Sequence, residues 1–172
     1  IMTNPDLPSG TDRVYAAFNK INNKEDYTSI INLQGDMPLI DPSIIERVNI
    51  PLSNGYEIGT IATDLNEDEE KNKNITKVII NWKQKNQIGE SIDFFKSTQR
   101  HNSKIYQHVG IYSFKPIMLR KFVSLEPSIN EVDRKLEQFR AIDAGIKIGI
   151  TYVENVPISV DTLEDLMVIE KI

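Results

Sequence analysis

Thr28-Ser29-Ile30-Ile31-Asn32-Leu33-Gln34-Gly35-Asp36 is the stretch that decides the fold of this chain. Its strand part is mostly apolar and rich in β-branched side chains, which is typical of a strand buried in a sheet. The strand stops at Gly35-Asp36, so we expect the Asp36 carboxylate at the edge of the sheet where α/β folds bind ligands. Asp36 is therefore a candidate site residue; the alternative is that it only forms the turn.

Strand and helix patterns continue on both sides of this stretch. Before it, a turn at residues 8–12 leads into helical spacing of apolar residues, with Thr11 or Asp12 as the expected N-cap. After it, strand patterns occur at residues 57–63, 76–80, 91–95, 107–114 and 146–153, and helical patterns at residues 43–48, 117–123, 135–144 and from 162 onward. This alternation predicts the α/β class, with a mostly parallel sheet flanked by helices.

Three local signals mark helix ends. Asp41 or Ser43 is expected to cap the helix at residues 43–48. Gly145 stands where a helix C-terminus favours a residue with positive φ. Thr162 and Asp165 form a variant of the capping box, with Asp in place of Glu, at the start of the last helix.

Composition limits the class of protein. A chain of 172 residues is expected to form one core, and we take residues 1–172 as a single domain. A net charge of −5 and the lack of a basic stripe argue against a nucleic-acid partner, and the apolar runs are too short to cross a membrane. The absence of cysteine excludes disulfides and thiol chemistry and fits a reducing cytoplasm. Ile1 is not an initiator residue, so we expect further residues upstream.

A second carboxylate is a candidate partner for Asp36. Asp161 also ends an apolar segment, residues 156–160, and precedes a helix, so both carboxylates could meet at one edge of the sheet. Two oxygen ligands on loops suit magnesium (Mg²⁺), which binds one or two carboxylates together with phosphate oxygens and water. The alternative for Asp161 is an N-cap of the last helix.

Several polar side chains are candidates for a ligand pocket. Strand alternation puts His108, Gly110 and Tyr112 on one face, and Gly110 leaves room between two hydrogen-bonding side chains. A single strand histidine is also a common structural residue, and with only His101 besides it a multi-histidine metal centre is excluded. Glu137 and Gln138 lie in the helical pattern at residues 135–144, where the alternative is ordinary surface polarity.

No obvious nucleophile accompanies these residues. The sequence has neither a Ser-His-Asp arrangement nor a Walker lysine loop. Such a site fits direct displacement on phosphorus, where positioning and charge neutralisation supply the catalysis.

Ordered blocks of this sequence resemble the CMP-Kdo synthetases, the 3-deoxy-manno-octulosonate cytidylyltransferases. The blocks are Met2-Thr3-Asn4-Pro5 with Ser9-Gly10-Thr11-Asp12-Arg13, then Asn32-Leu33-Gln34-Gly35-Asp36-Met37-Pro38-Leu39-Ile40, His108-Val109-Gly110-Ile111-Tyr112, Leu136-Glu137-Gln138-Phe139-Arg140 and Val160-Asp161-Thr162-Leu163-Glu164-Asp165-Leu166. The resemblance runs from one end of the chain to the other. A single block is less specific, because a Gly-Asp pair after a strand also occurs in other sugar nucleotidyltransferases.

The resemblance implies a nucleotide-diphospho-sugar transferase (Rossmann-like) fold and a nucleotidyltransferase of lipopolysaccharide biosynthesis. Such an enzyme converts CTP and Kdo to CMP-Kdo and pyrophosphate with magnesium. The implied roles are metal binding for Asp36 and Asp161, nucleotide binding for Ser9 and Gly10, and sugar-acid binding for Arg13, Gln34, His108, Tyr112, Glu137 and Gln138. Arg13 suits the Kdo carboxylate because a guanidinium can donate two parallel hydrogen bonds.

The resemblance further implies a cytoplasmic homodimer. Residues 107–114 and 117–123 supply apolar surface that one domain of this size is not expected to cover fully. A two-fold axis that repeats a self-complementary patch is the commonest way to bury such surface. We therefore expect the two protomers to meet at these segments.

The chain departs from the family pattern in three places. Met37 stands where the family usually has Glu, and Lys96-Ser97 stands where it has Ser-Arg, in a segment that is shorter than expected. The family's opening strand and its Arg and Leu-Pro-Gly-Lys phosphate loop do not occur in this sequence. Without them the triphosphate has no cradle in this chain.

Two other interpretations stay open. The first is another cytidylyltransferase, acting on sialic acid or a polyol phosphate, against which residues 108–112 and 136–140 argue. The second is a non-catalytic remnant of the family that binds a sugar acid or a partner protein without turnover.

Overall fold

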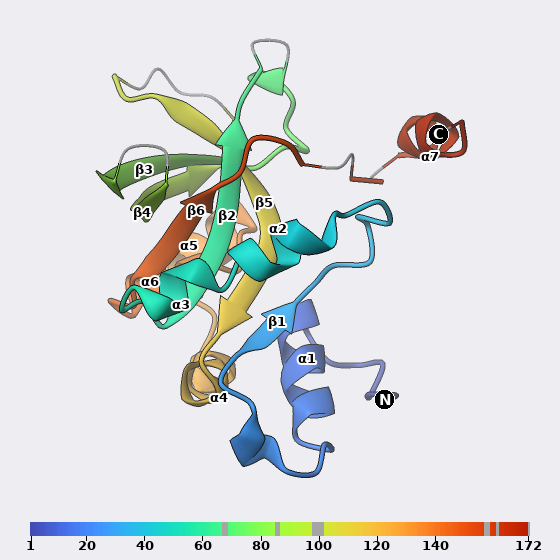
Figure 1. The fold of residues 1–172 in the computed structure, drawn as a ribbon, viewed down its shortest axis with the longest axis vertical. Helices are drawn as coiled ribbons and strands as arrows, with labels where there is room; N and C mark the ends of the chain where they lie inside the picture. The colour runs from blue at the N-terminus through green and yellow to red at the C-terminus, as the bar shows by residue number, and fades with distance from the viewer. Residues whose placement is uncertain (67–68, 85–86, 98–101, 157–158, 161, 172) are drawn as a thin grey trace.

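A computed structural model of the chain describes residues 1–66, 69–84, 87–97, 102–156, 159–160 and 162–171 (Figure 1). The described residues form a six-stranded sheet in the order β1-β5-β2-β6-β4-β3, in which β3 also pairs with β5. The strands are β1 (Ile30–Asn32), β2 (Ile58–Asp64), β3 (Lys77–Gln84), β4 (Ile88–Phe95), β5 (Ile105–Phe114) and β6 (Ile148–Tyr152). The helices are α1 (Gly10–Phe18), α2 (Pro42–Arg47), α3 (Ile50–Ser53), α4 (Pro116–Ser124), α5 (Ile129–Arg134), α6 (Phe139–Asp143) and α7 (Leu163–Ile169), with a 3₁₀ turn at Lys24–Asp26.

The α/β class is confirmed, but the expectation of a mostly parallel sheet is wrong. The pair β2–β6 is parallel, whereas the pairs β1–β5, β2–β5, β3–β4, β3–β5 and β4–β6 are antiparallel. For the β3–β4 pair the physical reason is that the two strands are consecutive, with no helix between them among the described residues. A parallel pair needs a long crossover, usually a helix, so strands joined directly pair in opposite directions.

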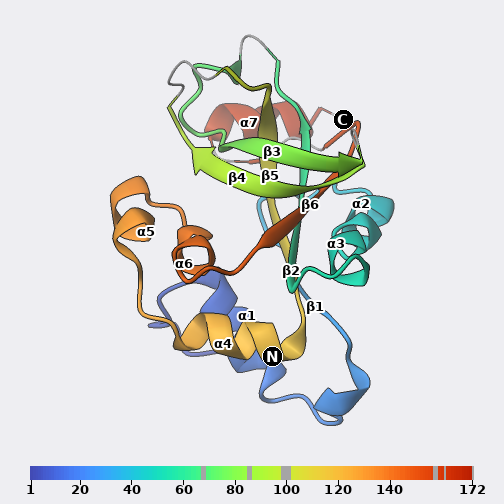
Figure 2. The ribbon, with the colours of Figure 1, turned by 90° about the vertical axis from the view of Figure 1, so that its left-hand side faces the viewer.

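Helices cover both faces of the central strands. Figure 2 shows α2 and α3 on one side of β2 and β6, and α5 and α6 on the other, with β3 and β4 running across the direction of β2. The strand β2 is buried along almost its whole length, from Ile58 to Thr63. Residues on both faces of this central strand are buried, and they include the polar Thr60 and Thr63 as well as Ile58 and Ile61.

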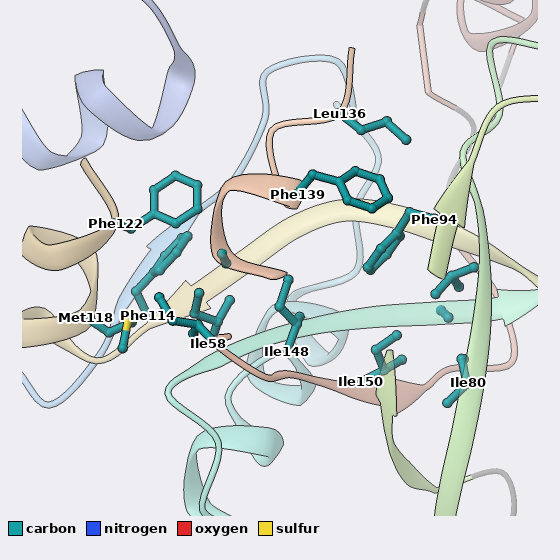
Figure 3. Packing of buried hydrophobic residues seen from close by; sticks show 14 of the residues in the cluster. Ile58, Ile80, Phe94, Phe114, Met118, Phe122, Leu136, Phe139, Ile148 and Ile150 are labelled. Carbon is teal, nitrogen blue, oxygen red and sulfur yellow. The ribbon is translucent and has the colours of Figure 1, made fainter. Parts of the chain in front are cut away.

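The main core lies between the sheet and helices α4 and α6. Figure 3 shows Phe122 and Phe139 on these helices near the strand residues Ile58, Phe114 and Ile148, all of which are at most 4% exposed. Each fully buried side chain of this size contributes about 1.5–3 kcal/mol. A second cluster on the other face joins Ile44 and Val48 to β2 and β5.

Two glycines allow α3 to approach the sheet closely. Gly59 on β2 and Gly149 on β6 are partners in the parallel ladder. A Cβ atom on Gly149 would lie 2.6 Å from Cβ of Pro51 in α3 and 2.5 Å from the ring of Tyr56, and one on Gly59 would lie 2.5 Å from the carbonyl oxygen of Val48. Side chains at these two positions would therefore force α3 away from the sheet.

Helix ends agree in part with the sequence patterns. Positive φ at Gly145, the Asp41 cap of α2 and the Thr162–Asp165 capping box are confirmed. The expected N-cap of α1 at Thr11 or Asp12 is wrong, because the Ser9 side chain accepts a hydrogen bond from the N–H of Asp12 and caps the helix.

The expected helix at residues 135–144 is also wrong in its first part. Lys135 adopts a left-handed conformation with φ of 54° and ends α5, and α6 begins only at Phe139. Glu137 and Gln138 therefore lie on the connection between two short helices. Among the described residues, no helix is long and apolar enough to cross a membrane.

Candidate functional site

A cavity of about 290 Å³ lies beside β5 where it meets the loop after β1. Its walls come from the loop after β1, the segment before β3, the strand β5, the α5–α6 connection and the segment before α7. The lining residues are Gln34, Asp36, Met37, Asn74, Ile75, Thr76, Gln107, His108, Val109, Gly110, Tyr112, Leu136, Gln138, Val156 and Ser159. Segments far apart in the sequence thus meet at one site.

Asp36 presents a free carboxylate oxygen to this region. The Ser159 hydroxyl donates to Oδ2 of Asp36 over 3.2 Å, and the N–H of Val160 donates to the Asp36 carbonyl oxygen over 2.8 Å. The other carboxylate oxygen, Oδ1, is buried and has no hydrogen-bond partner among the described residues. A buried anionic oxygen without a partner is costly, so this atom fits a cation or a donor on a ligand. Asp161, the second predicted metal ligand, lies outside the described residues.

The prediction that three residues of β5 share one face is confirmed. His108, Gly110 and Tyr112 all line the cavity, and a Cβ on Gly110 would meet no atom within 4 Å. The His108 ring packs edge-on against Phe94, with centroids 5.0 Å apart. Burial lowers the pKa of His108 to about 3, so the imidazole is neutral at physiological pH.

Tyr112 and Gln138 bring further unsatisfied polar atoms to the cavity. The Tyr112 hydroxyl and the Gln138 amide nitrogen are buried without a hydrogen-bond partner among the described residues. Burial, together with the negative charge of Glu137, raises the pKa of Tyr112 and keeps its phenol protonated. Both groups are donors, and buried donors without partners indicate a ligand or an ordered water.

Glu137 is bound to the first turn of α1 rather than to the cavity. The Ser9 hydroxyl lies 2.6 Å from Oε1 of Glu137, and the Thr11 hydroxyl donates to Oε2 over 2.9 Å. The network continues through Asn32, whose amide nitrogen donates to the Thr11 hydroxyl over 3.2 Å. The Gln34 amide nitrogen in turn donates to the Asn32 amide oxygen over 3.2 Å. This network connects the start of α1 to the cavity wall.

Gly10 belongs to the same arrangement. A Cβ on Gly10 would lie 3.3 Å from Nε2 of Gln34, so the backbone of α1 packs closely against that side chain. The structure thus brings Ser9, Gly10, Gln34 and Glu137 together at the edge of the cavity.

Arg13 has a different environment. Its guanidinium donates to the carbonyl oxygens of Asn4, Pro5 and Leu7, at 3.1, 2.7 and 3.4 Å. It holds the N-terminal loop against α1, and it is not among the residues that line the cavity.

Sequence reasoning missed three contributors to the site. Thr60 on β2 is fully buried and lies 2.9 Å from Nε2 of His108, and nothing in its strand pattern distinguishes it from an ordinary β-branched residue. Ser159 stands two positions before Asp161, and this closeness to a predicted metal ligand could have indicated that it belongs to the site. The wall at residues 74–76 is the third.

A buried lysine supports that wall. Lys77 directly follows residues 74–76, is fully buried, and donates from Nζ to the carbonyl oxygens of Asn72 and Lys96. Burial lowers its pKa, while the nearby Glu70 and Glu69 oppose that effect. The side chain ties the loop before β3 to the end of β4.

Comparisons with known proteins agree on one family. A family model described as cytidylyltransferase matches residues 1–148. The 3-deoxy-manno-octulosonate cytidylyltransferase of Paramagnetospirillum magneticum is 38% identical over 169 residues, which cover 96% of this chain and 69% of that protein. The protein of the same description from Brucella anthropi is 37% identical over 169 residues, covering 96% of this chain and 68% of its own length.

Solved structures give the same result for the fold. The structure of CMP:2-keto-3-deoxy-manno-octonic acid synthetase complexed with CTP matches with a TM-score of 0.85 and 29% identity, over 99% of this chain and 70% of that one. Apo UDP-glucose pyrophosphorylase matches with a TM-score of 0.63 at 12% identity, over 96% of this chain and 62% of that one, which shows a shared fold alone.

Proposed function

This chain belongs to the cytidylyltransferase family, among the 3-deoxy-manno-octulosonate cytidylyltransferases, and on that premise we propose that it activates Kdo with CTP. In this reaction the anomeric hydroxyl oxygen of Kdo attacks the α-phosphorus of CTP. The bond to pyrophosphate breaks, the hydroxyl loses its proton, and CMP-Kdo forms for lipopolysaccharide biosynthesis. The observation that carries the proposal is the buried, unpartnered Oδ1 of Asp36 among other unpartnered polar groups.

Magnesium is the proposed cofactor, with Asp36 and Asp161 as its ligands and catalytic residues. The free Oδ1 of Asp36 supports this assignment, because a carboxylate oxygen is the ligand type that Mg²⁺ prefers. When bound, the ion neutralises charge on the reacting phosphate. The other ligands of the ion are proposed to come from phosphate oxygens and water.

The sugar acid is proposed to bind against β5 and the α5–α6 connection. Gln34, His108, Tyr112 and Gln138 line the cavity, and the free Tyr112 hydroxyl and Gln138 amide would donate to hydroxyl or carboxylate oxygens. Glu137 contributes by holding the first turn of α1, and Ser9 and Gly10 in that turn are proposed to contact the nucleotide.

Arg13 is proposed to bind the Kdo carboxylate. The charge and planar shape of its guanidinium support this role. Its present hydrogen bonds go to backbone carbonyls, so substrate binding would exchange these neutral partners for an anion.

A substrate panel tests the proposed function. Pyrophosphate release is measured with CTP, Mg²⁺ and either Kdo, sialic acid or a polyol phosphate. We expect turnover with Kdo, and no turnover when Kdo or Mg²⁺ is omitted. Preference for another acceptor would assign the chain to a different cytidylyltransferase. Binding of Kdo or CTP without pyrophosphate release would favour a non-catalytic member of the family.

We also propose a cytoplasmic homodimer. The absence of cysteine is consistent with a reducing compartment. The helices α4 and α5 expose Ile117 at 74%, Ile129 at 81% and Val132 at 62%, and a two-fold interface would bury such side chains. The expected contribution of β5 to this surface is wrong, because β5 is paired with strands on both edges and Phe114 is 2% exposed.

A further inference from the structure

The contact between Thr60 and His108 lies at a β-bulge. Thr60 pairs with Tyr112 across the β2–β5 ladder, but the next residue, Ile61, pairs with Val109, so β5 has additional residues at this point. Bulges are common beside active sites, where they redirect side chains. Here the bulge brings two backbone carbonyls of β5 to the Thr60 hydroxyl, at 2.8 Å for Ile111 and 3.2 Å for Val109.

The contacts of the Thr60 hydroxyl favour one protonation state of the His108 ring. A threonine hydroxyl has one proton to donate, and a carbonyl oxygen can only accept. Donation to the Ile111 or Val109 carbonyl leaves the hydroxyl oxygen free to accept, whereas donation to His108 would leave both carbonyls facing the oxygen without a proton between them. The first arrangement satisfies more of these contacts, and in it Nε2 of His108, at 2.9 Å, donates to the hydroxyl and carries the proton of the ring.

The remaining ring nitrogen then becomes an acceptor. A neutral imidazole with its proton on Nε2 has an unprotonated Nδ1. The low pKa that burial gives to His108 agrees with a neutral ring. His108 lines the cavity that also contains Gly110 and Tyr112, so a hydroxyl of a bound ligand is the natural donor to this atom.

We propose that Thr60 is a positioning residue that holds His108 as the Nε2–H tautomer, so that Nδ1 accepts a hydrogen bond from a hydroxyl of the sugar-acid substrate. This inference rests on the proposed function for the identity of the substrate. It gives His108 a selective role, because Nδ1 accepts from a hydroxyl and repels a carboxylate. The acid group of the substrate must then bind elsewhere.

The tautomer is tested by long-range ¹H–¹⁵N NMR of the histidine side chains. The chain has two histidines, so His101→Gln assigns the signals of His108. We expect a neutral ring with Nε2 protonated and Nδ1 unprotonated between pH 5 and 8 (about two units above the lowered pKa at the acid end). A ring protonated on Nδ1 would overturn the proposal.

Two variants link the tautomer to binding. Thr60→Val removes the hydroxyl at similar size, and Thr60→Ser keeps it as the matched control. We expect Thr60→Val to mix the tautomers and raise KM for Kdo by about tenfold, with KM for CTP nearly unchanged. Thr60→Ser should retain the wild-type spectrum and KM. Thr60→Val with an unchanged spectrum and an unchanged KM would contradict the proposal.

The two proposals fail in different ways. A protein that shows the Nε2–H tautomer but does not turn Kdo over would support the role of Thr60 in fixing the ring and contradict the proposed function. A protein that turns Kdo over with His108 protonated on Nδ1 would support the proposed function and contradict the role of Thr60. Circular dichroism of both variants identifies a loss of fold, and the NMR result for the wild-type protein tests the tautomer without either variant.

Discussion

The backbone N–H of Val160 donates a hydrogen bond of 2.8 Å to the carbonyl oxygen of Asp36. This contact joins the loop after β1 to the segment before α7, and the Ser159 hydroxyl adds a second bond to the Asp36 carboxylate. The two residues that precede Asp161 in the sequence are therefore held against Asp36. This relationship supports the proposal that the two carboxylates share one cation.

Asp36→Asn should lower turnover by roughly 10³-fold. The substitution removes a charged metal ligand, and the metal would stabilise the charge on the reacting phosphate by several kcal/mol. Asp161→Asn should have a similar effect. The measurement is pyrophosphate release at saturating Mg²⁺. Asp26→Asn, at an exposed carboxylate of the 3₁₀ turn, is the control and should keep wild-type activity. Near-normal turnover of both site variants would reject the metal assignment.

Glu137→Gln should destabilise the protein by about 1.5–3 kcal/mol, since hydrogen bonds to a charged group are lost. The amide would also place a donor against the Ser9 or Thr11 hydroxyl, which now donates to the carboxylate. Urea unfolding measures the change, and KM for CTP reports whether the first turn of α1 has moved. Glu126→Gln, at an exposed position, should change neither quantity.

Gly149→Ala and Gly110→Ala form a matched pair with opposite expected effects. A methyl group at Gly149 would contact Pro51 and the Tyr56 ring, so we expect a loss of about 1–3 kcal/mol in the free energy of unfolding. A methyl group at Gly110 meets no atom within 4 Å and projects toward the cavity, so stability should change by less than about 0.5 kcal/mol while KM for Kdo rises. Equal destabilisation by both substitutions would contradict the packing described for α3.

His108 should make the protein less stable in acid. Its pKa is about 3 in the folded protein, against an ordinary value of 6.5 for an exposed histidine. The unfolded chain therefore binds more protons between these values, and the free energy of unfolding falls as the pH drops. The slope contributed by His108 should approach about 1.4 kcal/mol per pH unit. Chemical unfolding from pH 7 to 5 should show a smaller decline for His108→Gln than for the wild-type protein. Parallel curves would show that His108 is not buried as a neutral ring.

Ile117→Glu tests the proposed dimer. The side chain is 74% exposed on α4, so a charge there should leave the isolated fold intact but oppose an apolar interface. Light scattering at micromolar concentration should report twice the chain mass for the wild-type protein and a lower mass for the variant. A fully active wild-type monomer would refute the dimer.

The sequence predicted the position of Asp36 and the common face of His108, Gly110 and Tyr112, because both follow from where a strand ends and how its side chains alternate. The antiparallel β3–β4 pair could have been expected, because no helical pattern separates residues 76–80 from 91–95, and strands joined without a helix pair in opposite directions. Which other edges pair was not predictable, since the strand patterns carry no information about it. The partner of Glu137 depends on the left-handed Lys135, which interrupts a helical pattern that is otherwise regular. The role of Thr60 depends on a shift of register that no local pattern encodes.

The sheet order has a consequence for how the chain is made. The strand β6 lies between β2 and β4 in the sheet, although both precede it in the sequence. During synthesis, β2 and β4 therefore present open edges until Tyr152 has left the ribosome. A nascent chain halted before β6 would leave these two edges open to pairing with strands of other chains, so the sheet is most exposed to aggregation just before β6 emerges.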